Sequence, residues 1–212
     1  MKSTPLIITA LILAFAGTSL RADVTLGDAT FNATSADVAE NWLDPMPVGV
    51  TKTFEGFGAN QGQTRTISFS DGGEVGGVKS LKRHLVDKSA PGLPGSTPTE
   101  TTEDIWIAFD GTDNARVLKV ERGGAVIFEA TAAATPPLYL PADPQEGQSW
   151  EVAGTTVTLE QVLGSRSGYR LKVTYVNAAG ESHSDYLHAG EGVVRTEAGT
   201  SGWQPKPTQA AE

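Results

Sequence analysis

Residues 169–176 read Tyr-Arg-Leu-Lys-Val-Thr-Tyr-Val, and this run decides the fold class. Apolar or aromatic side chains occupy every second position, and Arg170, Lys172 and Thr174 fall between them. A β-strand points successive side chains to opposite faces of its sheet, so the alternation predicts a strand with one buried face and one wet face. The following residues 177–180, Asn-Ala-Ala-Gly, are of the types that hairpin turns use. The run therefore predicts an antiparallel sheet.

The same signature recurs along most of the chain. Short strand-like runs occur at 64–69, 105–109, 116–121, 125–130, 155–163, 184–188 and 193–197. Arg122, Gly123 and Gly124 form a second hairpin turn, and two longer breaks lie at 87–102 and 131–144. The chain has 24 glycines and 12 prolines in 212 residues, which favours many turns over long helices.

One short helix is expected near the start. Thr34 or Ser35 can cap a helix over 36–43, and Pro45 and Pro47 end it. We therefore expect an all-β protein: a twisted antiparallel meander, either a half-barrel or two related sheets, with one short N-terminal helix.

The first 22 residues have the pattern of a secretory signal peptide. Lys2 precedes an apolar run at 6–16 that is too short to cross a bilayer, and small residues follow. Cleavage after Ala22 is expected, with cleavage after Ala16 as the alternative. No integral membrane segment is expected in the mature chain, and with no cysteine it carries neither disulfides nor a lipid-modified cysteine. We expect an exported, soluble protein, periplasmic or extracellular and not lipidated.

The remaining chain divides into two β halves, 23–130 and 145–200. A linker at 131–144 with four prolines separates them, and 201–212 reads as a loose C-terminal tail. The halves share a weak pattern in which Phe54 corresponds to Trp150 and Trp106 to Tyr186. Either a duplication or periodic turns that imitate one explains this pattern.

Charge excludes two classes of partner. Loss of Lys2 and Arg21 with the leader leaves 14 basic against 25 acidic residues. Nucleic acid and anionic membranes are therefore poor partners, since they bind clustered Lys and Arg. The side chains of the densest basic stretch, 79–88, would divide between the two faces of a strand. We interpret these charges as protecting an exposed sheet edge from pairing with other chains, or as keeping one face in water.

The stretch 140–150, Leu-Pro-Ala-Asp-Pro-Gln-Glu-Gly-Gln-Ser-Trp, and the closing run 186–195, Tyr-Leu-His-Ala-Gly-Glu-Gly-Val-Val-Arg, carry a resemblance. Residues 137–197 resemble a β-rich module of bacterial exported proteins that has no assigned activity. The resemblance implies a β fold and no catalytic residue. His188 departs from the apolar residue more usual in its closing run.

Several residues of these motifs have structural roles on physical grounds. Gly147 permits a positive φ before a strand, Trp150 is a large apolar plug, and Gly190 and Gly192 permit a tight bend. Trp106 and Tyr186 are also expected to be structural, with burial of the tryptophans favoured over a sugar-stacking platform.

Candidate chemistry is sparse. Asp110, Asp113 and Asn114 begin a stretch that resembles a calcium loop ending at Glu121, but Ala115 stands where that loop needs glycine. We interpret the segment as a hairpin turn with these three residues exposed, which leaves weak calcium binding open. His183 and His188 would lie on opposite faces of a strand, and Ser182, His183 and Asp185 cannot form a triad from adjacent positions.

These observations predict no catalytic set, no cofactor and no metal centre. The expected function is a non-catalytic binding or scaffold module of the envelope or extracellular space, with an unknown partner. The alternatives are a carrier that holds an apolar ligand in a concave sheet, and a hydrolase that acts on envelope polymers.

Overall fold

The computed structural model describes residues 23–31, 48–49, 51–91, 97–164, 170–189 and 191–206. In these residues the fold is all-β with antiparallel strand pairing, as predicted. The helical element in this part of the chain is a single 3-10 turn, η2 (Gly58–Asn60). The helix expected over 36–43 and the leader at 1–22 lie outside the described residues.

Two antiparallel meanders of six strands make up most of one sheet. The first consists of β3 (Thr51–Phe57), β4 (Thr64–Val75), β5 (Val78–Lys88), β6 (Glu100–Phe109), β7 (Ala115–Arg122) and β8 (Ala125–Glu129). The second consists of β10 (Ser149–Val152), β11 (Thr155–Leu163), β12 (Arg170–Asn177), β13 (Ser182–His188), β14 (Gly192–Ala198) and β15 (Ser201–Pro205). A further strand, β9 (Leu138–Leu140), lies within the expected linker and pairs with β7.

The two meanders join through their sequence-distant strands β15 and β3. Trp203 lies opposite Gly56, and Gly202 lies opposite Phe57. A Cβ atom on Gly202 would lie 2.1 Å from the carbonyl oxygen of Thr196, so the close approach of β15 to β14 requires glycine there. The interpretation of 201–212 as a loose tail is therefore wrong for 201–205, whose backbone completes the sheet. The end of that segment, 207–212, lies outside the described residues.

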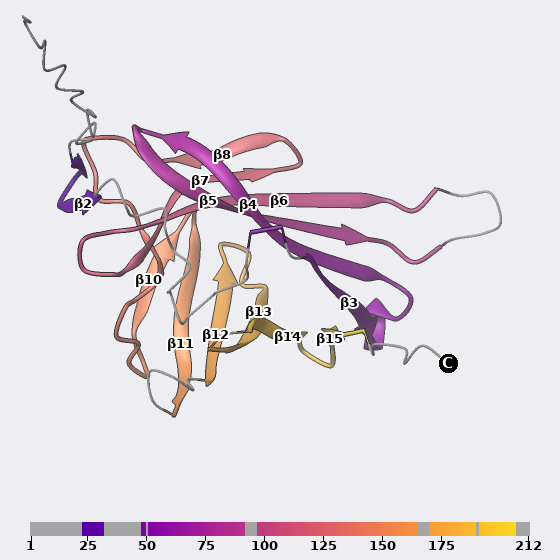
Figure 1. The fold of residues 1–212 in the computed structure, drawn as a ribbon. Coiled ribbons are helices and arrows are strands. Elements are labelled where there is room, and N and C mark those ends of the chain that lie inside the picture. Colours follow the sequence, from indigo (N-terminus) through magenta and orange to yellow (C-terminus); the bar gives the residue numbers. More distant parts are fainter. Residues whose placement is uncertain are drawn as a thin grey trace, which may run out of the picture.

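The sheet bends so that the inner faces of the two meanders share one core (Figure 1). Alternate residues of the central strands, such as β4, β11 and β12, enter this core, as the period of two predicted. From the first meander these are chiefly Phe54, Ile67, Phe69 and Ile107, and from the second Val157, Leu159, Leu171, Val173, Leu187 and Val193. The two halves of the sequence are therefore not independent folding units.

A smaller core covers the outer face of the first meander. The hairpin of β1 (Val24–Leu26) and β2 (Ala29–Phe31) packs Leu26 and Phe31 against Val75, Val78 and Leu118. Trp106 is buried in this cluster, and its indole Nε1 donates a hydrogen bond to the carbonyl oxygen of Gly72 at 3.0 Å. The ammonium groups of Lys82 and Lys119 lie over its ring.

The strand order agrees with the weak sequence repeat. Phe54 and Trp150 both lie in the first strand of their meanders, on the side of the shared core. Trp106 and Tyr186 both lie in the fourth strand, on the outer face. A duplication would produce this correspondence, and it stays a prediction.

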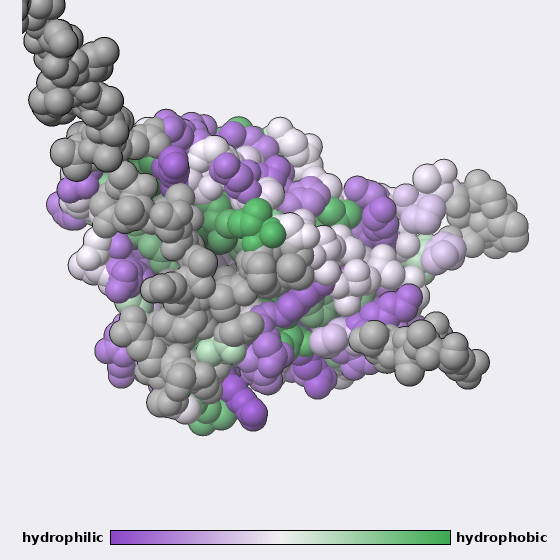
Figure 2. Space-filling model, viewed as in Figure 1, coloured by the Kyte–Doolittle hydropathy of each residue, from purple (hydrophilic) through white to green (hydrophobic). Residues whose placement is uncertain are grey.

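The described surface mixes polar and apolar side chains. In Figure 2 the hydrophobic patches on the visible face are small and separated by hydrophilic residues. Among the described residues there is no helix with the length and hydrophobicity needed to span a bilayer.

Candidate functional site

The segment predicted as a hairpin turn, with weak calcium binding left open, is a hairpin, but its first carboxylate is not exposed. Asp110 is buried, and its Oδ1 accepts hydrogen bonds from the Thr112 amide at 2.9 Å and hydroxyl at 2.6 Å, and from the Asn114 amide at 3.1 Å. Its Oδ2 accepts a hydrogen bond from Arg116. The expectation of an exposed Asp110 was wrong because the aspartate organises the turn from inside.

The other two residues of the turn, Asp113 and Asn114, also contribute to its structure. Asp113 is exposed with a φ of 62°, and the Asn114 side chain accepts a hydrogen bond from the Ala142 amide at 2.9 Å. Glu121 lies further along β7 and pairs with Lys119 at 2.6 Å. Within the described ranges, no three His, Cys, Asp or Glu side chains gather into a possible metal site.

The residues expected to be structural lie at the ends and outer faces of strands. Gly147 has a φ of 86° just before β10, and Gly192 has a φ of 67° at the start of β14, whereas Gly190 lies outside the described residues. Trp150 is half-buried against the shared core, and its Nε1 has no hydrogen-bond partner. The Tyr186 hydroxyl donates to Glu197 at 2.7 Å.

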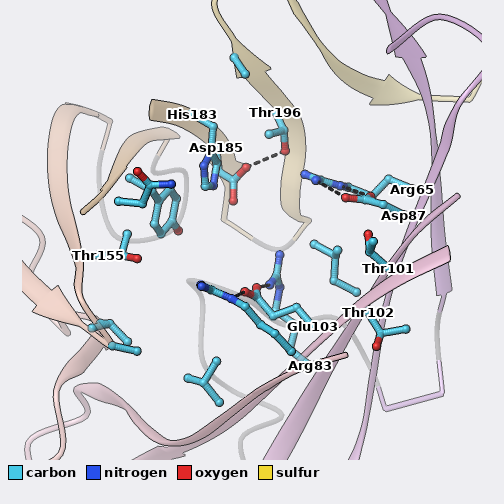
Figure 3. Close-up of a pocket in the computed structure, with 18 of the residues that line it drawn as sticks. Arg65, Arg83, Asp87, Thr101, Thr102, Glu103, Thr155, His183, Asp185 and Thr196 are labelled. Atoms are coloured by element: carbon cyan, nitrogen blue, oxygen red, sulfur yellow. Dashed lines mark hydrogen bonds and ion pairs between the residues drawn. The ribbon is translucent and has the colours of Figure 1, made fainter. Parts of the chain in front are cut away.

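The feature that the sequence did not reveal is a cavity between the two meanders. Its volume is about 700 Å³, within the range of small-molecule sites. Much of its wall is apolar or aromatic, from Leu85, Val117, Val120, Tyr139, Val152, Val157, Tyr175 and Trp203. Charged and polar side chains from both meanders face the same space (Figure 3).

Arg83 of β5 forms the charged part of the wall contributed by the first meander. Its side chain is 7% exposed, and its Nε has no hydrogen-bond partner. The Glu103 carboxylate lies 3.6 Å from Arg83 Nη1, while its other oxygen accepts a hydrogen bond from Arg122 Nε at 2.8 Å. One carboxylate thus serves two guanidinium groups, and Arg83 is the more weakly paired of the two.

The charge on Arg83 persists despite its burial. Burial by itself lowers the pKa of the guanidinium, but the neighbouring Tyr139, Glu103 and Asp185 raise it above its ordinary value overall. A buried charge that stays ionised without a close partner is costly to the fold. Such a group is therefore a candidate for binding something that enters the cavity.

The second meander contributes a facing wall with a carboxylate. Asp185 of β13 is buried and accepts a hydrogen bond from the Thr196 hydroxyl at 2.6 Å. Two residues earlier, the His183 ring stacks on Tyr175 of β12, with ring centroids 4.7 Å apart. Because residues i and i+2 of a strand share a face, His183 and Asp185 enter the cavity together.

The environment of this wall shifts two pKa values. Burial lowers the pKa of His183 below its ordinary value, and the Arg65 charge acts in the same direction against the opposing charge of Asp185. His183 is an exposed residue that lines the cavity, and the protein atoms around its ring produce this desolvation. Burial also raises the pKa of the Tyr175 phenol, so both rings are uncharged at neutral pH.

Arg65, Asp87 and Trp203 close one side of the cavity. Arg65 donates two hydrogen bonds of 2.7 Å to Asp87, one to each carboxylate oxygen. Trp203 lines the cavity next to this ion pair. Its indole Nε1, like Arg83 Nε and Trp150 Nε1, is a buried donor without a hydrogen-bond partner, and these atoms lie behind the cavity surface.

The arrangement does not assemble a hydrolytic triad. Ser184 alternates with His183 and Asp185 on β13 and is not part of the cavity wall, and Ser182 lies at the exposed start of the strand, where it borders the cavity. The Ser184 hydroxyl instead hydrogen-bonds to that of Thr174 at 2.7 Å. The polar groups on the walls can bind and orient a ligand, and the interpretation of Ser182, His183 and Asp185 as not forming a triad agrees with this geometry.

Comparisons with protein-family models, with curated proteins and with solved structures found no match. The case for function therefore depends on the cavity itself.

Proposed function

We propose that the protein is an exported, non-catalytic binding protein that holds a small ligand in the cavity between its two meanders. The observation that carries this proposal is an open volume of about 700 Å³ whose wall contains a buried arginine, Arg83, and its described carboxylate partner Glu103 lies 3.6 Å away and is shared with Arg122. A buried charge is stabilised by a close and well-aligned partner. An anionic group of a ligand can supply that partner.

The composition of the wall supports a ligand with an apolar part. Small-molecule sites combine predominantly apolar walls with a few fixed polar groups, and this cavity has both. The proposal is therefore close to the alternative function expected from the sequence, a carrier of an apolar ligand. It differs because the cavity wall contains more polar groups than a purely apolar ligand needs. Export follows from the leader pattern at 1–22, and the resemblance of 137–197 to a module of bacterial exported proteins supports the same location.

A blocking substitution tests the proposal. Thr155 lines the cavity, whereas the next residue, Thr156, is exposed on the other face of β11. The mature protein is titrated with the apolar dye N-phenyl-1-naphthylamine, and its fluorescence is followed. We expect saturable binding that Thr155→Trp abolishes and Thr156→Trp leaves within about threefold of the parent. Failure of the parent protein to bind the dye saturably would contradict the proposal, as would equal binding by both variants.

A further inference from the structure

Two opposite charges lie on facing walls of the cavity: Arg83 has one long ion pair that it shares with Arg122, and Asp185 has no cation close to it among the described residues. Among the described residues, the carboxylate within 4.0 Å of the Arg83 guanidinium is Glu103, at 3.6 Å, and that group is engaged by Arg122. Asp185 accepts a hydrogen bond from Thr196, and no cation of the described chain lies within 4.0 Å of it. Figure 3 shows the two side chains on opposite sides of the same space.

Two of the other charged groups of the cavity are ion-paired, and a third is solvent-exposed. Arg65 and Asp87 form a two-point ion pair, Glu100 pairs with Lys88 at 3.1 Å, and the exposed Glu181 accepts a hydrogen bond from the neutral Asn177 amide at 2.8 Å. Arg83 and Asp185 are distinguished from these by burial, with exposures of 6% for each whole residue. Buried charges require a partner, so the cavity has one unmet demand for an anion and another for a cation.

We infer that the ligand is a small zwitterion with an apolar group, whose carboxylate binds Arg83 and whose ammonium group binds Asp185. This inference rests on the proposed binding function and adds the class of ligand. A free amino acid or a short peptide with apolar side chains has this chemistry. Its apolar group would pack against Val117, Tyr139 and Val157.

Ligands of a single charge fit the cavity less well. An apolar carboxylate would satisfy Arg83 but leave Asp185 unpaired and would be repelled by it. An apolar amine would satisfy Asp185 and leave Arg83 as it is. A zwitterion can pair with both Arg83 and Asp185. Because these two groups lie on opposite walls, they select the orientation of the ligand as well as its charge.

Competition against bound N-phenyl-1-naphthylamine tests the inference. The competitors are phenylalanine and leucyl-phenylalanine, which carry both charges at different separations, and 3-phenylpropionate and phenethylamine, which carry one charge each. We expect at least one zwitterion to displace the dye at a concentration tenfold or more below that of either single-charge compound. Equal or better displacement by a single-charge compound, or no displacement by either zwitterion, would overturn the inference. Dye binding would persist in that case, and the proposed function would stand.

Substitutions then assign each charge to its wall. Arg83→Gln should remove the advantage of the zwitterion over phenethylamine, and Asp185→Asn should remove its advantage over 3-phenylpropionate. Lys82→Gln and Asp104→Asn are the matched controls, since these charges pair with each other on the outer face of the sheet at 3.0 Å. If Arg83→Gln does not fold, as judged by its thermal midpoint, Arg83→Lys replaces it, and tenfold weaker zwitterion binding is expected because an ammonium group cannot reproduce the guanidinium geometry. Preferences that survive both cavity substitutions would contradict the assignment.

Discussion

The Arg65 guanidinium lies 3.7 Å from the centre of the Trp203 ring, and this contact joins β4 of the first meander to β15 of the second. The same guanidinium holds Asp87 of β5 through two hydrogen bonds. One arginine therefore links three strands at the place where the two meanders meet, next to the cavity.

Trp203→Ala should destabilise the protein by about 3 kcal/mol, because it removes a large half-buried side chain and the stacking partner of Arg65. Urea unfolding of the mature protein measures the change. Gln204→Ala is the control, since Gln204 is the next residue of β15 and is exposed. A loss for Trp203→Ala no larger than that for Gln204→Ala would mean that the junction contributes little to stability.

Asp110→Ala should cost about 3 kcal/mol of unfolding free energy, because it removes a buried carboxylate that accepts hydrogen bonds from the Thr112 and Asn114 amides and pairs with the partly buried Arg116 guanidinium. Asp113→Asn removes the exposed neighbouring charge and serves as the comparison, since Asn tolerates the positive φ of this position. Denaturant unfolding at pH 7 gives both values, and comparable effects would show that the hydrogen bonds to Asp110 do not matter.

Acid should weaken the same turn in a defined direction. Burial of Asp110 would raise its pKa, but hydrogen bonds from Thr112, Arg116 and Asn114 lower the pKa below its ordinary value overall. A carboxyl group with a lowered folded-state pKa stabilises the protein above its unfolded-state pKa, about 3.9, and loses this effect as the pH falls through the folded-state value. Stability measured between pH 5 and pH 2 should therefore fall more steeply for the parent than for Asp110→Asn. Parallel curves would refute this.

Calcium should not bind tightly at the 110–121 segment, because protein donors occupy both oxygens of Asp110 and Glu121 pairs with Lys119 away from the turn. Calorimetric titration of the metal-stripped mature protein should show no affinity stronger than the range of about 0.1–1 mM typical of weak extracellular sites. Glu121→Gln should leave the heat unchanged. Micromolar affinity that this substitution abolished would be the contrary result.

Mild acid should also act through His183. Its pKa is lowered in the folded state by burial, so the unfolded chain binds the proton more readily. The stabilising effect of the neutral ring is complete above the unfolded-state pKa, about 6.5, and declines as the pH falls toward the lower folded-state value. The thermal midpoint of the parent should drop more between pH 7 and pH 5 than that of His183→Gln, with His188→Gln as a control for the loss of an imidazole. A larger drop for His183→Gln would reverse the assigned sign.

Export predicts a specific mass. Protein recovered from its native host should lack residues 1–22, since Lys2, the apolar run and Ala22 have the pattern of a cleavable leader. Intact-mass spectrometry measures this, and a mass that retained Met1 through Arg21 would remove the basis for the exported location.

Local pattern was enough to predict the strands of the shared core. Ile67 and Phe69, or Leu171 and Val173, alternate with polar residues because the sheet buries one face, and this is visible in any short window. Pairing of β15 with β3 left no such signal. Residues 201–205 contain Gly202 and Pro205 and resemble a tail, and only tertiary contacts with Phe57 and Gly56 make them a strand.

The cavity was missed for a different reason. Arg83 occurs in a basic stretch that reads as a solvated face, but β5 pairs on both sides with β4 and β6 and is not a sheet edge. The available signal was its register: Arg83 lies two residues from Leu81 and from Leu85, and so shares their inward face. Asp185 has the same relation to Leu187. A charged residue at an inward position of an alternating strand indicates a polar cavity only when the residues opposite it are known. The sequence alone does not show which residues lie opposite.

The junction of β3 with β15 also sets the order in which the molecule can assemble. Synthesis delivers β3 early and β15 only after the whole second meander, so one edge of the first meander stays open for most of that time. Contacts between segments so distant in sequence make folding slow, and an open edge in a growing chain invites pairing with other chains. Because β15 is the last strand of the sheet along the chain, its pairing with β3 is the step that completes the sheet.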